Sequence, residues 1–409
     1  MRMEDVPYGR QSQEGMGGVS YRFVASLFFA GSLLWTLSVC AAPIGGQITA
    51  GAGAVSQAGG NTTINQASQN LSLSWQSFNV GTHESVNFVQ PNAAAIAVNR
   101  IADTSASQIL GSLNANGQVF LINPNGIVFG AGAQVNVGGL VASTLNISDS
   151  ELTTASRRFS GSGAGAVINR GTVTAAPGGY VAFLGHQVSN QGTIRAPGGT
   201  VALGAGSTVS LSFDASRLLS MRVDANELNA LAENKQLMVA DGGQVLMSAG
   251  ARNSLLASVV NNTGVVQAQT VANHDGRIVL LAGMAAGTTE VGGTLDASAP
   301  TGGDGGFIET SAAHVHVSDA ARITTKADAG GKTGTWLIDP QDYTIAAGGG
   351  DITGSALSQQ LGSSSVTIVS SQGGTAGSGN INVNDAVSWN ANTLTLTAAN
   401  NIDINAVMT

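Results

Sequence analysis

The sequence predicts an all-β protein that folds as a right-handed parallel β-helix, a solenoid with an N-terminal cap and one short helical excursion. Three observations support this fold class. After Pro43, short runs rich in Val, Ile, Leu and Thr alternate with Gly-Gly, Asn-Gly and Pro-Gly-Gly turns. Part of this pattern recurs at an offset of 20 to 21 residues. Charged residues make up only 10% of the chain, where about a quarter is usual.

The repeat is clearest in the middle of the chain. Asn169–Val173 followed by Ala176–Leu184 recurs as Asn190–Ile194 followed by Ala196–Leu203. A unit of about 20 residues is too short for a βαβ unit and fits one coil of a β-helix. In stacked coils, Val, Ile and Leu fill the interior, whereas Asn, Ser and Thr form hydrogen-bonded ladders. Weaker copies of the turn and strand begin at Gly242, Gly276 and Gly305.

The composition excludes several classes of protein. An apolar content of 43% with a net charge of -8 is not that of a disordered chain. The 16 Lys and Arg residues are scattered among 24 Asp and Glu residues, so we expect no nucleic-acid binding. Cys40 is the only cysteine, which excludes disulfide frameworks and cysteine-based metal sites. No cofactor is expected.

Residues 1–41 are expected to form a secretory signal peptide. A basic segment ending at Arg22 precedes the apolar run Phe23–Leu37, and small residues follow up to Ala42. The apolar run is shorter than the roughly 20 residues that a membrane-spanning helix needs, which favours a cleaved signal. The sequence leaves open whether translation starts at Met1 or at Met16.

Residues 213–238 interrupt the coil pattern. Several Leu residues alternate there with Asp, Asn, Glu and Arg, and Asn226 is a candidate N-cap with Glu227 in the first turn. This predicts a short amphipathic helix at about Asn226–Glu233. The alternative is an irregular loop that leaves the coils.

A longer motif lies between Gly117 and Thr144. It contains Asn123–Ile127 (Asn-Pro-Asn-Gly-Ile) and then Val135–Thr144. Over roughly residues 45–345, the chain resembles the secretion domain of two-partner-secretion exoproteins of the filamentous-haemagglutinin type. Gly334–Pro340 is also similar to an element of large adhesins in that group. Many members also carry an earlier Asn-Pro-Asn-Leu motif, and the chain departs from them in having only Gln90-Pro91-Asn92 nearby.

The resemblance implies an export pathway. The Sec machinery is expected to carry the chain across the inner membrane, and a dedicated outer-membrane barrel transporter with POTRA domains to carry it outside, where it folds. The secreted or surface-displayed product is expected to be an adhesin that binds host or neighbouring cells. The residues that the resemblance assigns to transporter recognition are Asn123, Pro124, Asn125, Gly126, Ile127, Asn136, Gly138 and Gly139.

The same resemblance divides the mature chain. Residues 42–150 are expected to form the N-terminal cap and the first part of the secretion domain, and residues 151–345 the coils with an insertion near 213–238. Residues 346–409 are expected to begin a further adhesin repeat region. Because strand pattern persists through Ile402–Val407, the sequence leaves open whether the chain is a fragment of a larger exoprotein.

The Asn-Pro-Asn-Gly sequence predicts a tight turn on physical grounds alone. Pro124 fixes φ, Asn125 tolerates a left-handed conformation, and Gly126 adopts one without strain. The sequence does not decide whether the transporter contacts this turn or whether the turn only shapes the fold.

The rival interpretation is a carbohydrate-active β-helix enzyme, such as a polysaccharide lyase or hydrolase. Such an enzyme needs acids and bases on one face. The best candidates are His314 and His316 with Glu309 and Asp319, but period-two spacing predicts a solvated pair of histidines on one exposed face. We therefore predict no catalytic residues and no metal site. The remaining histidines, expected at the surface or in turns, are His83, His186 and His274.

Overall fold

The structure, a computed structural model, describes residues 41–213, 218–224, 229–250, 258–328, 330–371 and 377–409, and all of these belong to one compact unit. Residues 1–40 of the predicted signal peptide lie outside the described residues. Among the residues that are described, no helix combines the length and apolar character needed to cross a membrane.

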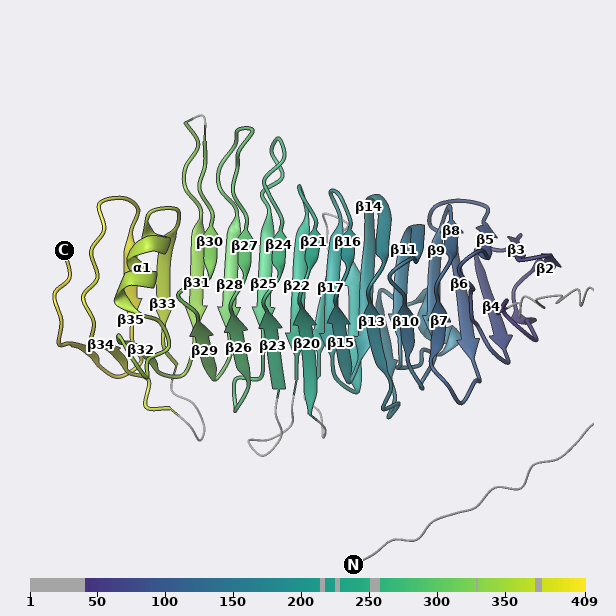
Figure 1. Ribbon diagram of the computed structural model, residues 1–409, viewed down its shortest axis with the longest axis horizontal. Helices are drawn as coiled ribbons and strands as arrows, with labels where there is room; N and C mark the ends of the chain where they lie inside the picture. The colour runs from purple at the N-terminus through teal and green to yellow at the C-terminus, as the bar shows by residue number, and fades with distance from the viewer. Residues whose placement is uncertain (1–40, 214–217, 225–228, 251–257, 329, 372–376) are drawn as a thin grey trace, which may run out of the picture. The chain divides into compact units, whose positions relative to one another are not determined.

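The chain winds into stacked coils, and equivalent strands of successive coils pair in parallel (Figure 1). We name the three rows of strands faces A, B and C. Face A comprises β3 (Asn61–Gln66), β5 (Ser85–Val89), β8 (Ser112–Ala115), the first part of β11 (Gln134–Ser143), the first part of β14 (Thr172–Gly185), β16 (Thr193–Arg195), β21 (Leu237–Val239), β24 (Val265–Gln267), β27 (Thr294–Asp296) and β30 (Arg322–Thr324). Face B comprises β4 (Asn70–Trp75), β6 (Ile96–Ile101), β9 (Gln118–Ile122), the remainder of β11 and β14, β17 (Thr200–Ala205), β22 (Gln244–Ala249), β25 (Arg277–Leu281), β28 (Phe307–Ser311), β31 (Thr335–Asp339), β33 (Ser365–Val369) and β35 (Leu394–Thr397). Face C comprises β7 (Ser107–Ile109), β10 (Ile127–Phe129), β13 (Ala166–Asn169), β15 (Gln187–Asn190), β20 (Ala230–Asn234), β23 (Ser258–Asn262), β26 (Thr288–Val291) and β29 (His314–Val317).

The remaining strands close or decorate the coils. At the N-terminal end, β1 (Gln47–Ala50) pairs antiparallel with β4, and β2 (Gly53–Ala58) pairs antiparallel with β3, which forms the predicted cap. Near the C-terminal end, β32 (Tyr343–Ile345), β34 (Ile381–Val383) and β36 (Ile402–Ile404) form a parallel sheet of their own.

The register between coils confirms the predicted repeat. Val201 pairs with Val181 of the preceding coil and with Val245 of the next, and the same row continues through Ile278 and Ile308. All five side chains are fully buried. Parallel pairing places equivalent side chains above one another, so a single interior cluster runs through the coils.

A ladder of buried asparagines confirms the predicted stacking of polar side chains. Asn169, Asn190, Asn234 and Asn262 end successive face C strands, and all four are fully buried. Nδ2 of each of the first three donates to Oδ1 of the next asparagine, at 2.9, 2.8 and 2.8 Å. Further bonds from Nδ2 to backbone carbonyls satisfy the remaining donor capacity, as burial requires.

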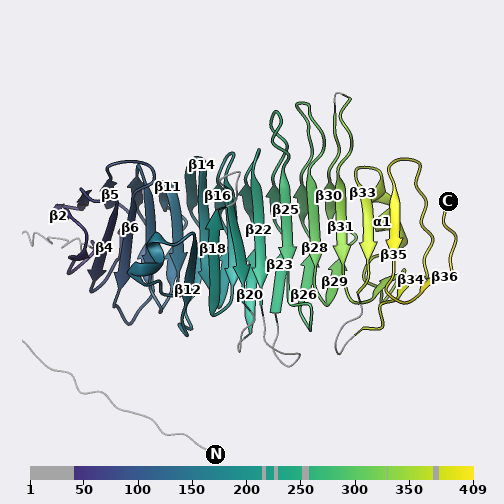
Figure 2. The same ribbon diagram turned by 180° about the vertical axis from the view of Figure 1, so that it is seen from behind.

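A small antiparallel sheet lies outside the coils, over face B (Figure 2). It consists of β12 (Ser156–Ser160), β18 (Thr208–Phe213) and β19 (Leu219–Val223). Its apolar underside packs on outward-facing side chains of face B; the rings of Phe159 and Phe120, for example, are 5.9 Å apart. A 3-10 helix, η1 (Asp149–Thr153), also covers this surface through buried Leu152.

The prediction of a helix at about Asn226–Glu233 is wrong. Residues 226–228 lie outside the described residues, but Ala230–Asn234 form strand β20, which pairs with β15 and β23. Parallel pairing and the place of Asn234 in the asparagine ladder outweigh the local helical pattern. The insertion after β17 is instead the strand pair β18–β19.

The α-helix of the described chain lies elsewhere, at α1 (Gly354–Leu361). Its N-cap is Thr353, whose Oγ1 accepts a hydrogen bond from the backbone N–H of Ala356 at 3.1 Å. The buried side chains of Leu357 and Leu361 belong to the interior cluster, so the helix helps to close the coil near β30 and β33.

Candidate functional site

Asn123–Ile127 forms a turn at the corner between face B and face C. The backbone N–H of Gly126 donates to the carbonyl of Asn123 at 3.0 Å, and Gly126 has a φ of +113°, which favours glycine. The Asn123 side chain is fully buried. Its Nδ2 donates to the Ser105 carbonyl and to Ser107 Oγ, both at 3.0 Å, and its Oδ1 accepts from the Asn125 N–H at 2.9 Å. Asn123 therefore holds the turn from inside.

The tip of the turn is accessible. The side chains of Pro124 and Asn125 are exposed, while Ile127 is buried in β10 between Ser107 and Val167. Asn125 Nδ2 donates to the Asp103 carbonyl at 2.7 Å, which ties the tip to the loop of the preceding coil. The tip thus has a fixed shape and presents two side chains outward.

Asn136, Gly138 and Gly139 lie at a different corner, between face A and face B. Asn136 is exposed on face A, and its Nδ2 donates to Asn114 Oδ1 at 3.4 Å. A Cβ on Gly138 would lie 2.7 Å from the Gly117 carbonyl oxygen, and one on Gly139 would lie 2.9 Å from the Tyr180 ring. Both glycines are thus required by close packing. Because β9 separates the two corners, the predicted residues do not form one site.

Two hollows, of about 330 and 320 Å³, flank Gly138. Tyr180 and Phe213 line the larger one, with ring centroids 5.5 Å apart. The Tyr180 hydroxyl donates to Gln118 Oε1 at 2.6 Å. Burial raises the pKa of Tyr180 far above its usual range, although Arg157 acts in the opposite direction, so the hydroxyl stays protonated.

Gln90 of the divergent Gln90-Pro91-Asn92 sequence is a structural residue. Its side chain is buried, and Nε2 donates to Gln66 Oε1 and to the Ala95 carbonyl, both at 3.0 Å. Its Oε1 accepts from the Gly117 N–H at 2.9 Å. Pro91 and Asn92 are exposed.

The candidate acid–base residues have separate partners. His316 Nδ1 lies 3.1 Å from Asp351 Oδ1, whereas Asp319 accepts from the Thr353 hydroxyl at 2.6 Å. Glu309 accepts from the Ser311 hydroxyl at 3.1 Å. Within the described ranges, no group of three or more His, Cys, Asp or Glu side chains is arranged to hold a metal ion. Sequence reasoning missed Asp351, whose position beside β29 depends on how the coil closes.

The isolated histidines lie at the surface or in a turn, as expected, but His186 is buried in its turn between β14 and β15. His83 and His274 are exposed, but His186 is only 5% exposed, and neither of its ring nitrogens has a hydrogen-bond partner among the described residues. Burial lowers the pKa of His186 below its usual value. The residue directly precedes β15 of face C, and no local sequence signal indicates that its side chain is buried.

Comparison with known proteins gives one consistent result. A family model described as the TPS (two-partner secretion) secretion domain matches residues 41–295. A heme/hemopexin-binding protein of Haemophilus influenzae strain Rd is 34% identical over 255 residues, which is 59% of this chain and 27% of that protein. A second heme/hemopexin-binding protein of Haemophilus influenzae is 33% identical over 244 residues, 54% of this chain and 26% of the relative. The chain therefore spans about a quarter of the length of these relatives.

A solved structure shares the fold. The crystal structure of the HMW1 secretion domain from Haemophilus influenzae matches with a TM-score of 0.60 at 22% identity, covering 90% of this chain and 100% of that chain.

Proposed function

The chain belongs to the family of TPS secretion domains, and we propose from this premise that it directs the export of a longer exoprotein through a dedicated outer-membrane transporter. TPS exoproteins pass through the outer membrane and are secreted or displayed at the cell surface. A secretion domain of this kind implies a cognate outer-membrane transporter. The Sec route to the periplasm and recognition by POTRA domains are parts of the proposal.

We place transporter recognition at the tip formed by Pro124 and Asn125. The observation that supports this is a contrast in burial within the turn. Asn123 is fully buried and bonded internally, whereas the two residues after it are exposed. A preorganised loop that presents side chains outward loses little entropy on binding. Gly126 and Ile127 shape the tip, and Asn136, at the other corner, is a proposed second contact that Gly138 and Gly139 position.

Stepwise folding at the cell surface is the proposed driving force. A net stability of about 0.05 to 0.15 kcal/mol per residue gives a coil of about 20 residues roughly 1 to 3 kcal/mol once it has a neighbour to stack on. That is several RT, enough to disfavour backward movement of a finished coil. The unbroken interior row through Val201 and Val245 supports this view, because each coil completes the one before it.

We propose no catalytic role for this segment. The matched family is one of exoproteins and not a known enzyme family. The two carboxylates considered for a polysaccharide lyase or hydrolase, Glu309 and Asp319, are bonded to the separate hydroxyls of Ser311 and Thr353. His316 pairs with neither of them but with Asp351.

The rest of the exoprotein is proposed to be an adhesin for host or neighbouring cells. Residues 42–150 form the proposed cap and first part of the secretion domain, residues 151–345 its coils, and residues 346–409 the start of the adhesin repeats. The heme and hemopexin binding named for the two relatives belongs to proteins about four times as long, so we do not place it in this segment.

The deciding experiment is secretion with and without the partner. The chain is expressed in a heterologous Gram-negative host, alone or with its cognate outer-membrane transporter, and the culture medium is assayed. We expect release only with the transporter. Equal accumulation in the medium without it would contradict the proposal.

A further inference from the structure

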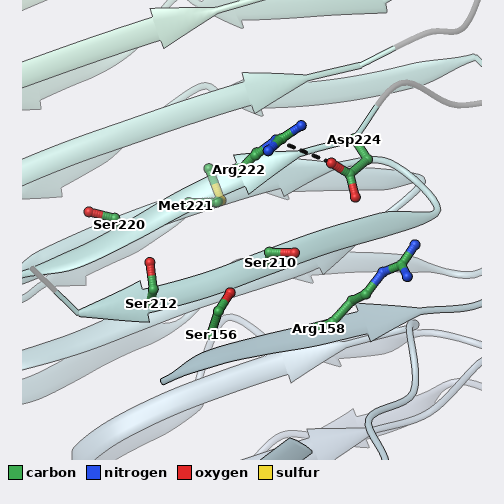
Figure 3. Close-up of a pocket in the computed structure, with 8 residues that line it drawn as sticks. All are labelled: Ser156, Arg158, Ser210, Ser212, Ser220, Met221, Arg222 and Asp224. Atoms are coloured by element: carbon green, nitrogen blue, oxygen red, sulfur yellow. Dashed lines mark ion pairs between the residues drawn. The ribbon is translucent and has the colours of Figure 1, made fainter. Parts of the chain in front are cut away.

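The outward face of the β12–β18–β19 sheet is not used in the export proposal. Its underside is fixed to face B by apolar packing, which makes it a rigid platform. The outward face carries a hollow of about 490 Å³, which is within the usual range for pockets that hold small ligands (Figure 3).

Strand register gives this face two parallel lines of side chains. In one line, Ser210 lies between Arg158 on β12 and Arg222 on β19. In the other, two residues along, Ser212 lies between Ser156 and Ser220. Since alternate residues share a face of a strand, both lines point outward and line the same hollow. The floor is therefore built of small hydroxyl side chains between two arginines (Figure 3).

Both guanidinium groups have donors available. Arg222 is 83% exposed and pairs with Asp224 through Nε, at 3.3 Å, which leaves its terminal nitrogens free of ion pairs within the described chain. The Arg158 side chain is exposed and has no ion pair with any described residue. Glu151 is also close, because its carboxylate accepts from the backbone N–H of Arg158 at 3.3 Å.

These charges limit the kind of ligand. Asp224 and Glu151 offset the two arginines, so the face has little net charge, and a polyanion such as a nucleic acid gains little from it. Directed hydrogen bonds remain: arginine donates in a planar fork to carboxylate or sulfate, and serine both donates and accepts. The two arginine Cα atoms are two strand spacings, about 10 Å, apart, so a ligand that reaches both has to extend across the sheet.

The geometry points to a binding site for a short saccharide that carries a single acidic substituent, a carboxylate or a sulfate. Its acidic group pairs with one arginine, its hydroxyls bond to the serine lines, and the second arginine binds its ring oxygens. This inference goes beyond export, and it is tested on the purified full chain without any transporter, so its failure would leave the export proposal intact.

The test is titration by ligand-detected NMR with three related probes: 3′-sialyllactose, 3′-sulfolactose and neutral lactose. We expect both acidic probes to bind and lactose to bind at least tenfold more weakly. Arg158→Gln and Arg222→Gln should each weaken binding of the acidic probes about tenfold, which corresponds to about 1.4 kcal/mol. Ser212→Ala should weaken both acidic probes to a smaller extent.

Arg195→Gln is the matched control, because Arg195 is an exposed arginine on face A, outside the hollow. It should leave binding within twofold of the unmodified chain, and unchanged thermal unfolding will show that every variant is folded. The assignment would be overturned if lactose, inorganic sulfate or a phosphoserine peptide bound as tightly as the acidic saccharides. It would also be overturned if neither arginine variant weakened the binding of the acidic saccharides. The two acidic probes distinguish a carboxylate from a sulfate as the preferred group.

Discussion

Asn190 Nδ2 donates to Oδ1 of Asn234 at 2.8 Å although 44 residues separate the two in sequence. The extra-coil strands β18 and β19 lie in that interval, and the ladder continues on the other side of them. A long insertion is therefore accommodated without a change of register, because the coils on both sides are joined through buried side chains as well as through backbone pairing.

The ladder should contribute measurably to stability. Asn190→Ala removes the bonds to Asn169 and Asn234 and leaves buried polar groups without partners, so we expect a loss of about 1 to 3 kcal/mol in the free energy of unfolding. Chemical denaturation followed by circular dichroism measures it. Asn136→Ala is the control, since Asn136 belongs to an exposed row and its replacement should change stability by less than about 0.5 kcal/mol. Equal effects of the two variants would show that the buried ladder has no special role.

Variants in the turn at Asn123–Ile127 should distinguish an effect on folding from an effect on transporter recognition. Asn123→Ala removes internal hydrogen bonds and should lower stability by about 1 to 3 kcal/mol. The double variant Pro124→Ala/Asn125→Ala changes two exposed side chains and removes one exposed hydrogen bond, from Asn125 to the Asp103 carbonyl. We expect it to fold with the stability of the unmodified chain to within about 1 kcal/mol but to lose about tenfold in transporter affinity, or about 1.4 kcal/mol.

Secretion assays with thermal unfolding measure both effects. Pro197→Ala, which alters an exposed proline in another turn, is the control and should be secreted normally. Normal secretion of the double variant would mean that the turn only shapes the fold.

Coil-by-coil folding predicts that interior charges slow export. Val201→Asp buries a charged group in the central row and should destabilise its coil by about 3 kcal/mol or more. Pulse-chase labelling should then show slower appearance in the medium. Val265→Asp is the matched control, because Val265 is 37% exposed on face A. Unchanged export kinetics for Val201→Asp would count against folding as the driving force.

Acid should destabilise the protein partly through His186. Because burial lowers its folded-state pKa below the unfolded value of about 6.5, the unfolded chain takes up the proton first as the pH falls. Above pH 6.5 the residue has no effect, and below it stability declines, by at most about 1.4 kcal/mol per pH unit, until the folded-state pKa is reached. His186→Phe should remove this part of the decline.

Chemical denaturation at pH 7.5 and at pH 5 compares the free energy of unfolding of the unmodified chain with that of His186→Phe. Asp149 contributes separately to the pH dependence. Burial raises the pKa of its carboxylate, but the Ser72 hydroxyl and Arg100 outweigh this effect and lower the pKa, so the stabilising effect of Asp149 is lost at more acidic pH. An identical pH dependence in His186→Phe would exclude His186 as a titrating group.

The sequence alone determined the features that are local or periodic. Alternating apolar residues and glycine-rich turns predict strands, and the recurrence of Asn169–Leu184 as Asn190–Leu203 predicts stacking, buried rows and a polar ladder. The Asn123–Ile127 motif, together with Val135–Thr144 and Gly334–Pro340, indicated the family. Each of these properties depends on the residues within a short segment of the chain and not on contacts between distant segments.

Contacts between distant segments were decided only by the tertiary structure. The run Val119–Ile122 is apolar at every position, which indicates a strand buried on both sides, yet nothing in it shows that β12, β18 and β19 provide the cover. The same holds for the burial of His186 and for the strand at Ala230–Asn234, where local pattern favoured a helix. The stacking of coils sets the burial and the register of residues that are dozens of positions apart. The free energy of this stacking exceeds the intrinsic helix and strand propensities on which a prediction from the local sequence depends.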